Sequence, residues 1–211
     1  MKILTTVCNS YSVNSYLLIA DDNKGVLIDP ACKDEEECRR LQQMIKDNNV
    51  SLVAMIATHT HADHVMGAKL VMDACPEAAF LMHKEAEPLY GMLNDYSMIM
   101  GFKKRELAKI TGYVTDNEML QFADIELQVL YTPGHAPGSV CLYSPKDKVV
   151  FSGDVLFQSS IGRTDLHGGS YEVLKTSIYE KLFTLPSDTM VLPGHGDGTT
   201  IAFEKENNPF L

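Results

Sequence analysis

Four apolar stretches of this chain each lead directly into a histidine or an aspartate. SLVAMIAT at residues 51–58 precedes His59, ELQVLYTPG precedes His135, VVFSG precedes Asp154 and TMVLPG precedes His195. Apolar runs of this length predict strands, and the sheet holds the loops at strand ends in fixed positions. We therefore expect a sheet-based fold that brings these strand ends, with their ligand-type side chains, to one place.

The first of these strand ends carries the dense motif THTHADH at residues 58–64. His59 and His61 lie two residues apart on a strand-end loop and can point into one site. Asp63 and His64 lie past the bend, at the start of an expected helix at 63–74, and can face a second site beside the first. The spacing favours a pair of neighbouring metal ions over a single buried histidine.

The type and number of these side chains restrict the metal. Imidazole and carboxylate ligands without cysteine suit zinc, iron or manganese. A catalytic zinc ion takes three protein ligands and a water molecule, so the set is too large for one ion and fits two ions that share a carboxylate. We expect two divalent ions, zinc first, with iron or manganese as alternatives. The expected ligands are His59, His61, Asp63, His64, His135, Asp154 and His195.

The remaining pattern predicts two successive rounds of strands and helices. Strands are expected at 3–8, 14–20, 25–31, 51–58 and 78–83, then at 118–132, 139–144, 148–156 and 189–196, and helices at 34–49, 63–74 and 170–183. Two sheets packed on each other, with helices outside, satisfy this order. The sequence thus predicts one α/β (α+β) domain over residues 1–211.

Residues 84–112 differ in composition from the rest of the chain because they are rich in methionine and tyrosine. We expect a helical insertion here that serves as a lid or a pocket wall; its methionines would equally suit a core or a contact between copies. The run Lys103, Lys104, Arg105 is either a solvated helix face or a contact for substrate carboxylates.

Composition excludes some classes of partner. The net charge of −10 argues against a nucleic-acid surface, and no run approaches the roughly 18 apolar residues that span a bilayer. Polar residues interrupt the N-terminal apolar stretch, so it lacks a signal-peptide core. The five scattered cysteines contain no C-x-x-C pair and suit free thiols in a reducing compartment. We expect a cytoplasmic protein without nucleic-acid or membrane partners. The sequence does not predict its oligomeric state.

Several motifs resemble the metallo-β-lactamase superfamily, and closely its glyoxalase II branch, the hydroxyacylglutathione hydrolases. They are NSYLL, VLIDP, THTHADHVMG, TPGHAPGSVCLY, FSGDVLF, GRTD, LPGHGDGTT and NNPFL. The resemblance implies the four-layer αββα sandwich. It also implies that His59, His61 and His135 hold the first metal, that Asp63, His64 and His195 hold the second, and that Asp154 bridges them.

A dinuclear site of this kind predicts hydrolysis. Two ions lower the pKa of a shared water toward neutrality, and an ion can steady an oxyanion. Asp63 and Asp154 would be the catalytic carboxylates. The leaving group of a thioester is a thiol with a pKa around 8.5, so its departure fits a chain without a strong proton donor. The chain also lacks the G-x-S-x-G elbow of a serine nucleophile. We expect a small-molecule thioester such as S-lactoylglutathione. Residues 196–211 are too few for the helical domain that grips glutathione in full-length glyoxalase II, so the substrate must be held otherwise.

Other chemistries stay open. His59, His135 and Asp154 form a 2-His-1-carboxylate set, and a mononuclear-iron persulfide dioxygenase would use it and leave His195 without a metal. A lactonase can share the whole ligand set. A metal-stabilised binding module is the non-enzymatic alternative, whereas a flavodiiron reductase, a secreted β-lactamase and a nuclease fit less well.

Three further side chains are expected to support the metal loops. Asp29 ends an apolar strand and would orient a neighbouring loop by hydrogen bonding. Arg163 and Asp165 in the GRTD motif would pair and brace the loop after Asp154. Tyr16, His83 and His167 are expected to be structural or surface residues.

Overall fold

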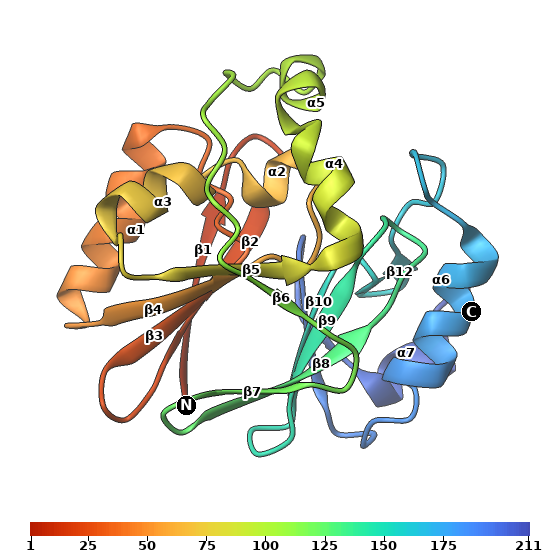
Figure 1. The fold of residues 1–211 in the computed structure, drawn as a ribbon. Helices are drawn as coiled ribbons and strands as arrows, with labels where there is room; N and C mark the ends of the chain where they lie inside the picture. Colours follow the sequence, from red (N-terminus) through yellow and green to blue (C-terminus); the bar gives the residue numbers. More distant parts are fainter.

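Two six-stranded β-sheets lie face to face in the computed structural model, which describes all 211 residues (Figure 1). The strands of the first sheet, in spatial order, are β1 (Lys2–Cys8), β2 (Val13–Ile19), β3 (Lys24–Ile28), β4 (Ser51–Ile56), β5 (Ala79–His83) and β6 (Gly112–Val114). Strands β1 to β3 run antiparallel, and β3 to β6 run parallel. The parallel half therefore gathers its carboxyl ends along one edge.

The second sheet is built from later residues. Its spatial order is β14 (Thr199–Thr200), β13 (Met190–Pro193), β10 (Val149–Gly153), β9 (Val140–Ser144), β8 (Ile125–Tyr131) and β7 (Met119–Phe122). Only β10 and β13 run parallel in this sheet. A small hairpin of β11 (Leu156–Phe157) and β12 (Ser160–Ile161) follows β10.

Helices cover the outer face of each sheet and complete four layers (Figure 1). On the first sheet lie α1 (Glu35–Asp47), α2 (Ala62–Val65), α3 (Ala68–Ala74), α4 (Glu87–Gly91) and α5 (Leu93–Ile99), with a 3-10 turn at Lys84–Ala86. On the second lie α6 (Tyr171–Ser177), a π-helical turn at Ile178–Leu182 and α7 (Ile201–Asn207). The mixed α/β sandwich expected from the sequence is confirmed. No helix is both long and apolar enough to span a membrane.

Alternation along the strands divides the core into layers, because successive side chains of a strand point to opposite faces. In β2, Leu18 faces the second sheet, while Leu17 faces the helices of the first. In β4, Ile56 and Met55 divide in the same way. A third cluster, which includes Leu174, fills the space between the second sheet and α6.

The helix expected at 63–74 is divided into α2 and α3. A Cβ atom on Gly67 would lie 2.3 Å from Cys32 Sγ and 2.7 Å from the Pro30 carbonyl oxygen. The Gly67 amide donates to that same carbonyl at 2.9 Å. The close approach of the 30–32 loop, which only glycine permits, interrupts the helix and places α2 separately beside β4.

The segment 84–112 is helical only as far as Ile99 and then irregular up to β6. Lys103, Lys104 and Arg105 lie on the irregular part, so the expectation of a helix face for them is wrong. Arg105 donates to Glu35 Oε1 at 2.8 Å and to the Lys33 carbonyl at 3.0 Å, which ties this irregular stretch to the start of α1.

Candidate metal centre

The structure brings all seven ligand-type residues to one edge of the sandwich. His59 follows β4, Asp154 follows β10 and His195 follows β13, each just beyond the carboxyl end of a strand. His135 lies in the loop between β8 and β9, and the pair Asp63 and His64 lies in the first turn of α2. The members from residues 59–64 belong to the first sheet's half of the molecule, and the other three belong to the second.

The first group combines two histidines from the β4 loop with one from the opposite sheet. The Nε2 atom of His135 lies 2.9 Å from His61 Nδ1 and 3.3 Å from His59 Nε2. The three ring nitrogens lie within 4.8 Å of one another. They therefore converge on a single point, as the ligands of one ion would.

The second group is formed by Asp63, His64 and His195, whose ligand atoms also lie within 4.8 Å of one another. The Nε2 atoms of His64 and His195 are 3.2 Å apart, and His195 Nε2 is 3.5 Å from Asp63 Oδ2. This group again takes members from both sheets.

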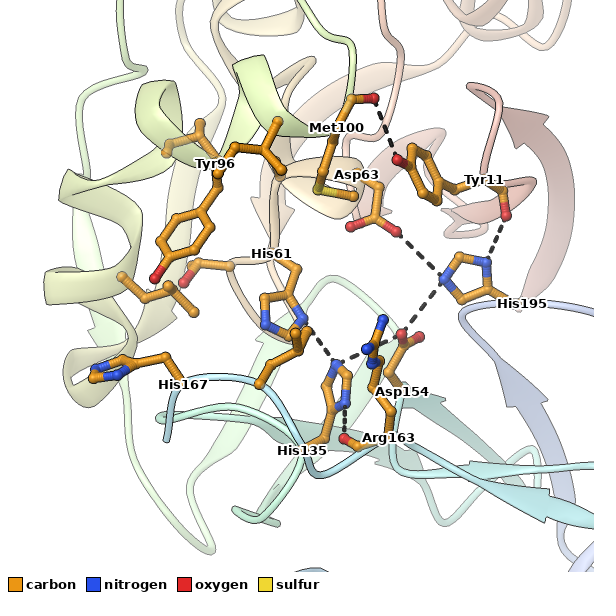
Figure 2. Close-up of a pocket in the computed structure, with 16 residues that line it drawn as sticks. Tyr11, His61, Asp63, Tyr96, Met100, His135, Asp154, Arg163, His167 and His195 are labelled. Atoms are coloured by element: carbon orange, nitrogen blue, oxygen red, sulfur yellow. Dashed lines mark hydrogen bonds and ion pairs between the residues drawn. The ribbon is translucent and has the colours of Figure 1, made fainter. Parts of the chain in front are cut away.

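The carboxylate of Asp154 lies between the two groups (Figure 2). Its Oδ1 is 3.3 Å from His64 Nε2, and its Oδ2 is 3.4 Å from His195 Nε2 and 3.6 Å from His135 Nε2. Asp154 Oδ1 is buried and has no hydrogen-bond partner. A buried carboxylate oxygen without a donor is costly unless a cation faces it, so this residue set fits a pair of metal ions.

The outer nitrogens of four histidines are held by oxygen atoms. The Nδ1 contacts are Thr58 Oγ1 for His59 (3.2 Å), Asp29 Oδ2 for His64 (2.9 Å), the Arg163 carbonyl for His135 (2.8 Å) and the Tyr11 carbonyl for His195 (2.8 Å). A carbonyl or carboxylate oxygen only accepts, so the proton of each neutral ring sits on Nδ1. The Nε2 lone pair is then free to bind a metal. His61 alone turns Nδ1 inward.

Asp29 orients two parts of the β4 loop at once, as expected. Its carboxylate accepts from the Thr58 amide (2.7 Å), from Thr58 Oγ1 (2.8 Å) and from His64 Nδ1 (2.9 Å). Asp29 has a left-handed backbone with a φ of 53°, a conformation that aspartate tolerates better than most residues. Because Thr58 Oγ1 donates to Asp29, it can accept from His59.

Burial sets the charge of the first group. It lowers the pKa of His59, His61 and His135, that of His61 to about 4, because a charged imidazolium is poorly solvated there. For Asp154, burial alone would raise the pKa, but the neighbouring His64 and His195 together more than reverse this and hold it well below its usual value. Neutral imidazoles and an ionised carboxylate are the forms that bind metals.

The second group carries positive charge when no cation is bound. Burial lowers the pKa of His195, but its contacts with Asp154 and Asp63 outweigh burial and raise it to about 9. In His64, burial is likewise outweighed, chiefly by Asp154 and Asp29, and the pKa is raised well above its usual value. The carboxylates thus demand a positive charge at this point, which a divalent ion would supply.

A cavity of about 460 Å³ opens onto these groups, and half of the residues that line it are hydrophobic (Figure 2). Its apolar wall comes from α4, α5 and the residue after them: Leu89, Leu93, Tyr96, Ile99 and Met100. Across from it lie Arg163, Leu166 and His167. The metal groups form the floor through His61, Asp63, His135, Asp154 and His195.

The sequence predicted an ion pair in the GRTD motif and suggested a substrate contact for the basic run at residues 103–105, and the structure treats the two differently. Arg163 pairs with Asp165 as expected, through two hydrogen bonds of 2.8 Å each. Lys103 and Lys104 are exposed and do not line the cavity, and Arg105 is engaged with Glu35. The cavity lining therefore lends no support to the suggested contact of this basic run with substrate carboxylates, which stays a prediction. His167, expected to be a structural or surface residue, is exposed and also lines the cavity.

Sequence reasoning missed a buried carboxylate in α7. Glu204 accepts from the Ser159 amide at 3.1 and 3.2 Å, from Thr199 Oγ1 at 2.6 Å and from Asn208 Nδ2 at 2.7 Å. The Ser159 turn joins β11 to β12, and the chain then reaches Arg163, whose carbonyl holds His135. No local signal marks Glu204, because an acidic residue on a short helix is usually solvated.

The family comparison agrees with this geometry. The family model of the metallo-beta-lactamase superfamily matches residues 9–195, which include all seven ligand-type side chains. The chain belongs to the metallo-beta-lactamase superfamily.

Relatives within this superfamily cover nearly the full chain. A probable metallo-hydrolase of Bacillus subtilis is 40% identical over 200 residues, which are 94% of this chain and 92% of the relative. The hydroxyacylglutathione hydrolase GloC of Haemophilus influenzae is 33% identical over 217 residues, which cover 100% of this chain and 98% of the relative.

Solved structures of the superfamily superpose closely. The B3 metallo-beta-lactamase BLEG-1 has a TM-score of 0.89 at 33% identity, covering 100% of this chain and 99% of its own. TTHA1623 in a di-iron-bound form has a TM-score of 0.88 at 33% identity, covering 99% and 100%. ETHE1 from Myxococcus xanthus has a TM-score of 0.81 at 28% identity, covering 99% and 84%. Membership therefore establishes a metallo-hydrolase superfamily enzyme and leaves its substrate to be argued.

Proposed function

We propose that this protein is a dinuclear metal-dependent hydrolase that cleaves a thioester. The observation that carries the proposal is the position of Asp154, whose carboxylate faces both ligand groups while one oxygen lacks any hydrogen-bond donor. His59, His61 and His135 would hold one ion, Asp63, His64 and His195 the other, and Asp154 would contact both. Zinc is the expected metal, and the di-iron form of TTHA1623 makes iron the first alternative.

The protein's own groups prepare the reaction. Two divalent ions, when bound, lower the pKa of a water molecule and polarise a carbonyl. Asp29 and the carbonyls of Tyr11 and Arg163 keep the ring lone pairs directed inward, so ligands need no reorientation. The apolar wall limits water around the reacting carbonyl. A thiol leaving group of pKa around 8.5 departs without a general acid.

S-lactoylglutathione is the first substrate to try, because the relative from Haemophilus influenzae is a hydroxyacylglutathione hydrolase. The similarity of 33% supports the reaction class more strongly than the identity of the thiol. A cytoplasmic location and the absence of nucleic-acid and membrane partners stay predictions from composition.

The test is Asp154→Ala, with metal content and turnover measured together. We expect loss of bound metal and a fall in thioester hydrolysis of more than about 100-fold, since even outer partners of ligands are worth 10–100-fold. Asp188→Ala is the control, because Asp188 is exposed and pairs only with Lys148. Near-wild-type turnover in Asp154→Ala would contradict the proposal.

A second candidate, a mononuclear-iron persulfide dioxygenase, is favoured by one observation. His59, His135 and Asp154 lie close together, with His135 Nε2 3.3 Å from His59 Nε2 and 3.6 Å from Asp154 Oδ2. This chemistry predicts one iron per chain and oxygen consumption on a persulfide, whereas hydrolysis predicts two ions and no oxygen use. Metal analysis beside a panel of thioesters, lactones and persulfides separates these chemistries and the lactonase alternative.

A further inference from the structure

The cavity above the metal groups is lined mainly by carbon. One wall consists of α4 and α5 side chains, among them Leu93, Tyr96 and Ile99, and Tyr11 and Leu166 extend the apolar surface. Figure 2 shows Tyr96 and Tyr11 in this lining. Ile99 leaves 83% of its surface exposed, which is unusual for isoleucine. An exposed apolar side chain at the rim of a polar metal site calls for an apolar ligand, because burying it is favourable only against carbon.

The cavity offers little to a charged ligand. Arg163 is the only arginine or lysine that lines it, and its charge is already paired with Asp165, to which Nε and Nη2 donate at 2.8 Å each. Lys103 and Lys104 lie outside the lining. Glutathione carries two carboxylates, and this cavity offers them a single guanidinium that is already paired with an aspartate.

We propose that the preferred substrate is a thioester with an uncharged, mainly apolar arm that packs against the α4–α5 wall, so that Ile99 and its neighbours determine specificity. The inference rests on the proposed thioesterase function. In the reaction, water adds its oxygen to the acyl carbon, the carbon–sulfur bond breaks with its electron pair going to sulfur, and the thiolate takes up a proton. The products are a carboxylic acid and a thiol, and no oxidant or co-reactant is needed.

The size of the cavity agrees with this class of ligand. About 460 Å³ lies in the range of roughly 300–1,000 Å³ that holds ligands of drug size. A lactoyl group, with its three carbons, would leave most of the apolar wall without a partner. A longer or cyclic apolar arm would cover it.

The experiment compares two series of thioesters with the metal-loaded protein. The acyl series runs from acetyl to octanoyl on N-acetylcysteamine, an uncharged thiol, and the thiol series varies alkyl length on a constant acetyl group. We expect kcat/KM to rise about fourfold per buried methylene in one series, because each is worth about 0.8 kcal/mol. The responding series identifies which arm meets the wall. A flat response in both, or a preference for S-lactoylglutathione over every apolar thioester, overturns the inference.

A pair of neighbouring variants tests the wall itself. Ile99→Ser removes a lining side chain, and Met98→Ser removes its neighbour, which is 60% exposed and does not line the cavity. Both positions are exposed, so the fold should be unaffected. For the longest good substrate we expect Ile99→Ser to lose about tenfold in kcat/KM, mostly through KM. The acetyl thioester should be affected much less, and Met98→Ser should match the wild type with both.

The two proposals fail in different ways. If the metal-loaded protein hydrolyses neither S-lactoylglutathione nor any thioester of either series, the proposed function is wrong. If it hydrolyses short and long thioesters equally well, or if Ile99→Ser and Met98→Ser respond alike, the function stands and the apolar-arm inference is wrong.

Discussion

The metal groups and the α4–α5 wall face the same cavity but are built in opposite ways. His59, His64 and His135 leave at most 2% of their surface exposed. The Nδ1 atom of each ring is hydrogen-bonded to an oxygen atom in a loop that follows a strand. On the wall, Ile99 is 83% exposed. The comparison suggests that chemistry depends on the rigid edge of the sandwich, whereas substrate selection depends on a surface that can change without disturbing the ligands.

Among the residues that support the metal ligands without being ligands themselves, Asp29→Ala should have the largest effect. The change leaves Thr58 and His64 without the carboxylate that orients them. We expect metal affinity to fall 10–100-fold and the free energy of unfolding to fall by about 3 kcal/mol, since buried donors lose their acceptor. Competition with a chelating dye and denaturant unfolding measure the two effects.

Asp73→Ala is the matched control for Asp29→Ala, because Asp73 pairs only with Lys69 at the surface. If Asp29→Ala keeps wild-type metal affinity, the metal ligands are not preorganised by this carboxylate, and the proposed contrast with an adaptable α4–α5 wall is wrong. This holds whatever the change in the free energy of unfolding.

Glu204→Ala should have an intermediate effect. Glu204 accepts the hydrogen bonds that hold the β11–β12 turn, and the chain leads from this turn to the Arg163 carbonyl. We expect a loss of about 2 kcal/mol in the free energy of unfolding and a smaller loss of metal affinity through His135. Glu206→Ala on the same helix is exposed and should change neither. An effect on KM alone would assign the turn to the substrate side.

The smallest effect should come from Asp34→Ala at the start of α1. The Asp34 side chain accepts from the Glu37 amide and caps the helix. Loss of the cap should cost about 1 kcal/mol in thermal or denaturant unfolding and leave metal content and turnover unchanged. A fall in turnover would show that the outer helical layer belongs to the rigid side as well.

Much of the fold follows from local patterns. Apolar runs such as 51–58 predict the strands, and alternation predicts that Met55 and Ile56 face different layers. The break at Gly67 could not be predicted, because it depends on the approach of Pro30 and Cys32, more than thirty residues away in sequence. The irregular stretch after Ile99 was also missed, because its helix-compatible residues are held by Arg105 contacts to α1.

In the candidate site, too, the sequence predicts one part, the ligands, and not the other, the groups that hold the ligands in place. The ligand-type residues stand out because their residue types and their positions after strands carry the signal. The atoms that hold them do not stand out, because the Tyr11 and Arg163 carbonyls belong to the backbone, and any residue type could supply them. The position of Thr58 directly before His59 could have indicated its supporting role. The role of Glu204 depends wholly on tertiary contacts, so the sequence does not indicate it.

Each ligand group takes donors from both sheets, and this has a thermodynamic consequence for the whole molecule. Ions bound at His135 and His195 would bridge the halves of the sandwich, so separating the sheets would require releasing them. Metal loading should therefore raise the melting temperature with increasing free-ion concentration, following the mass-action relation for a ligand that binds only the native state. Chelation would remove this contribution and leave the apolar cluster between the sheets to hold the two halves together.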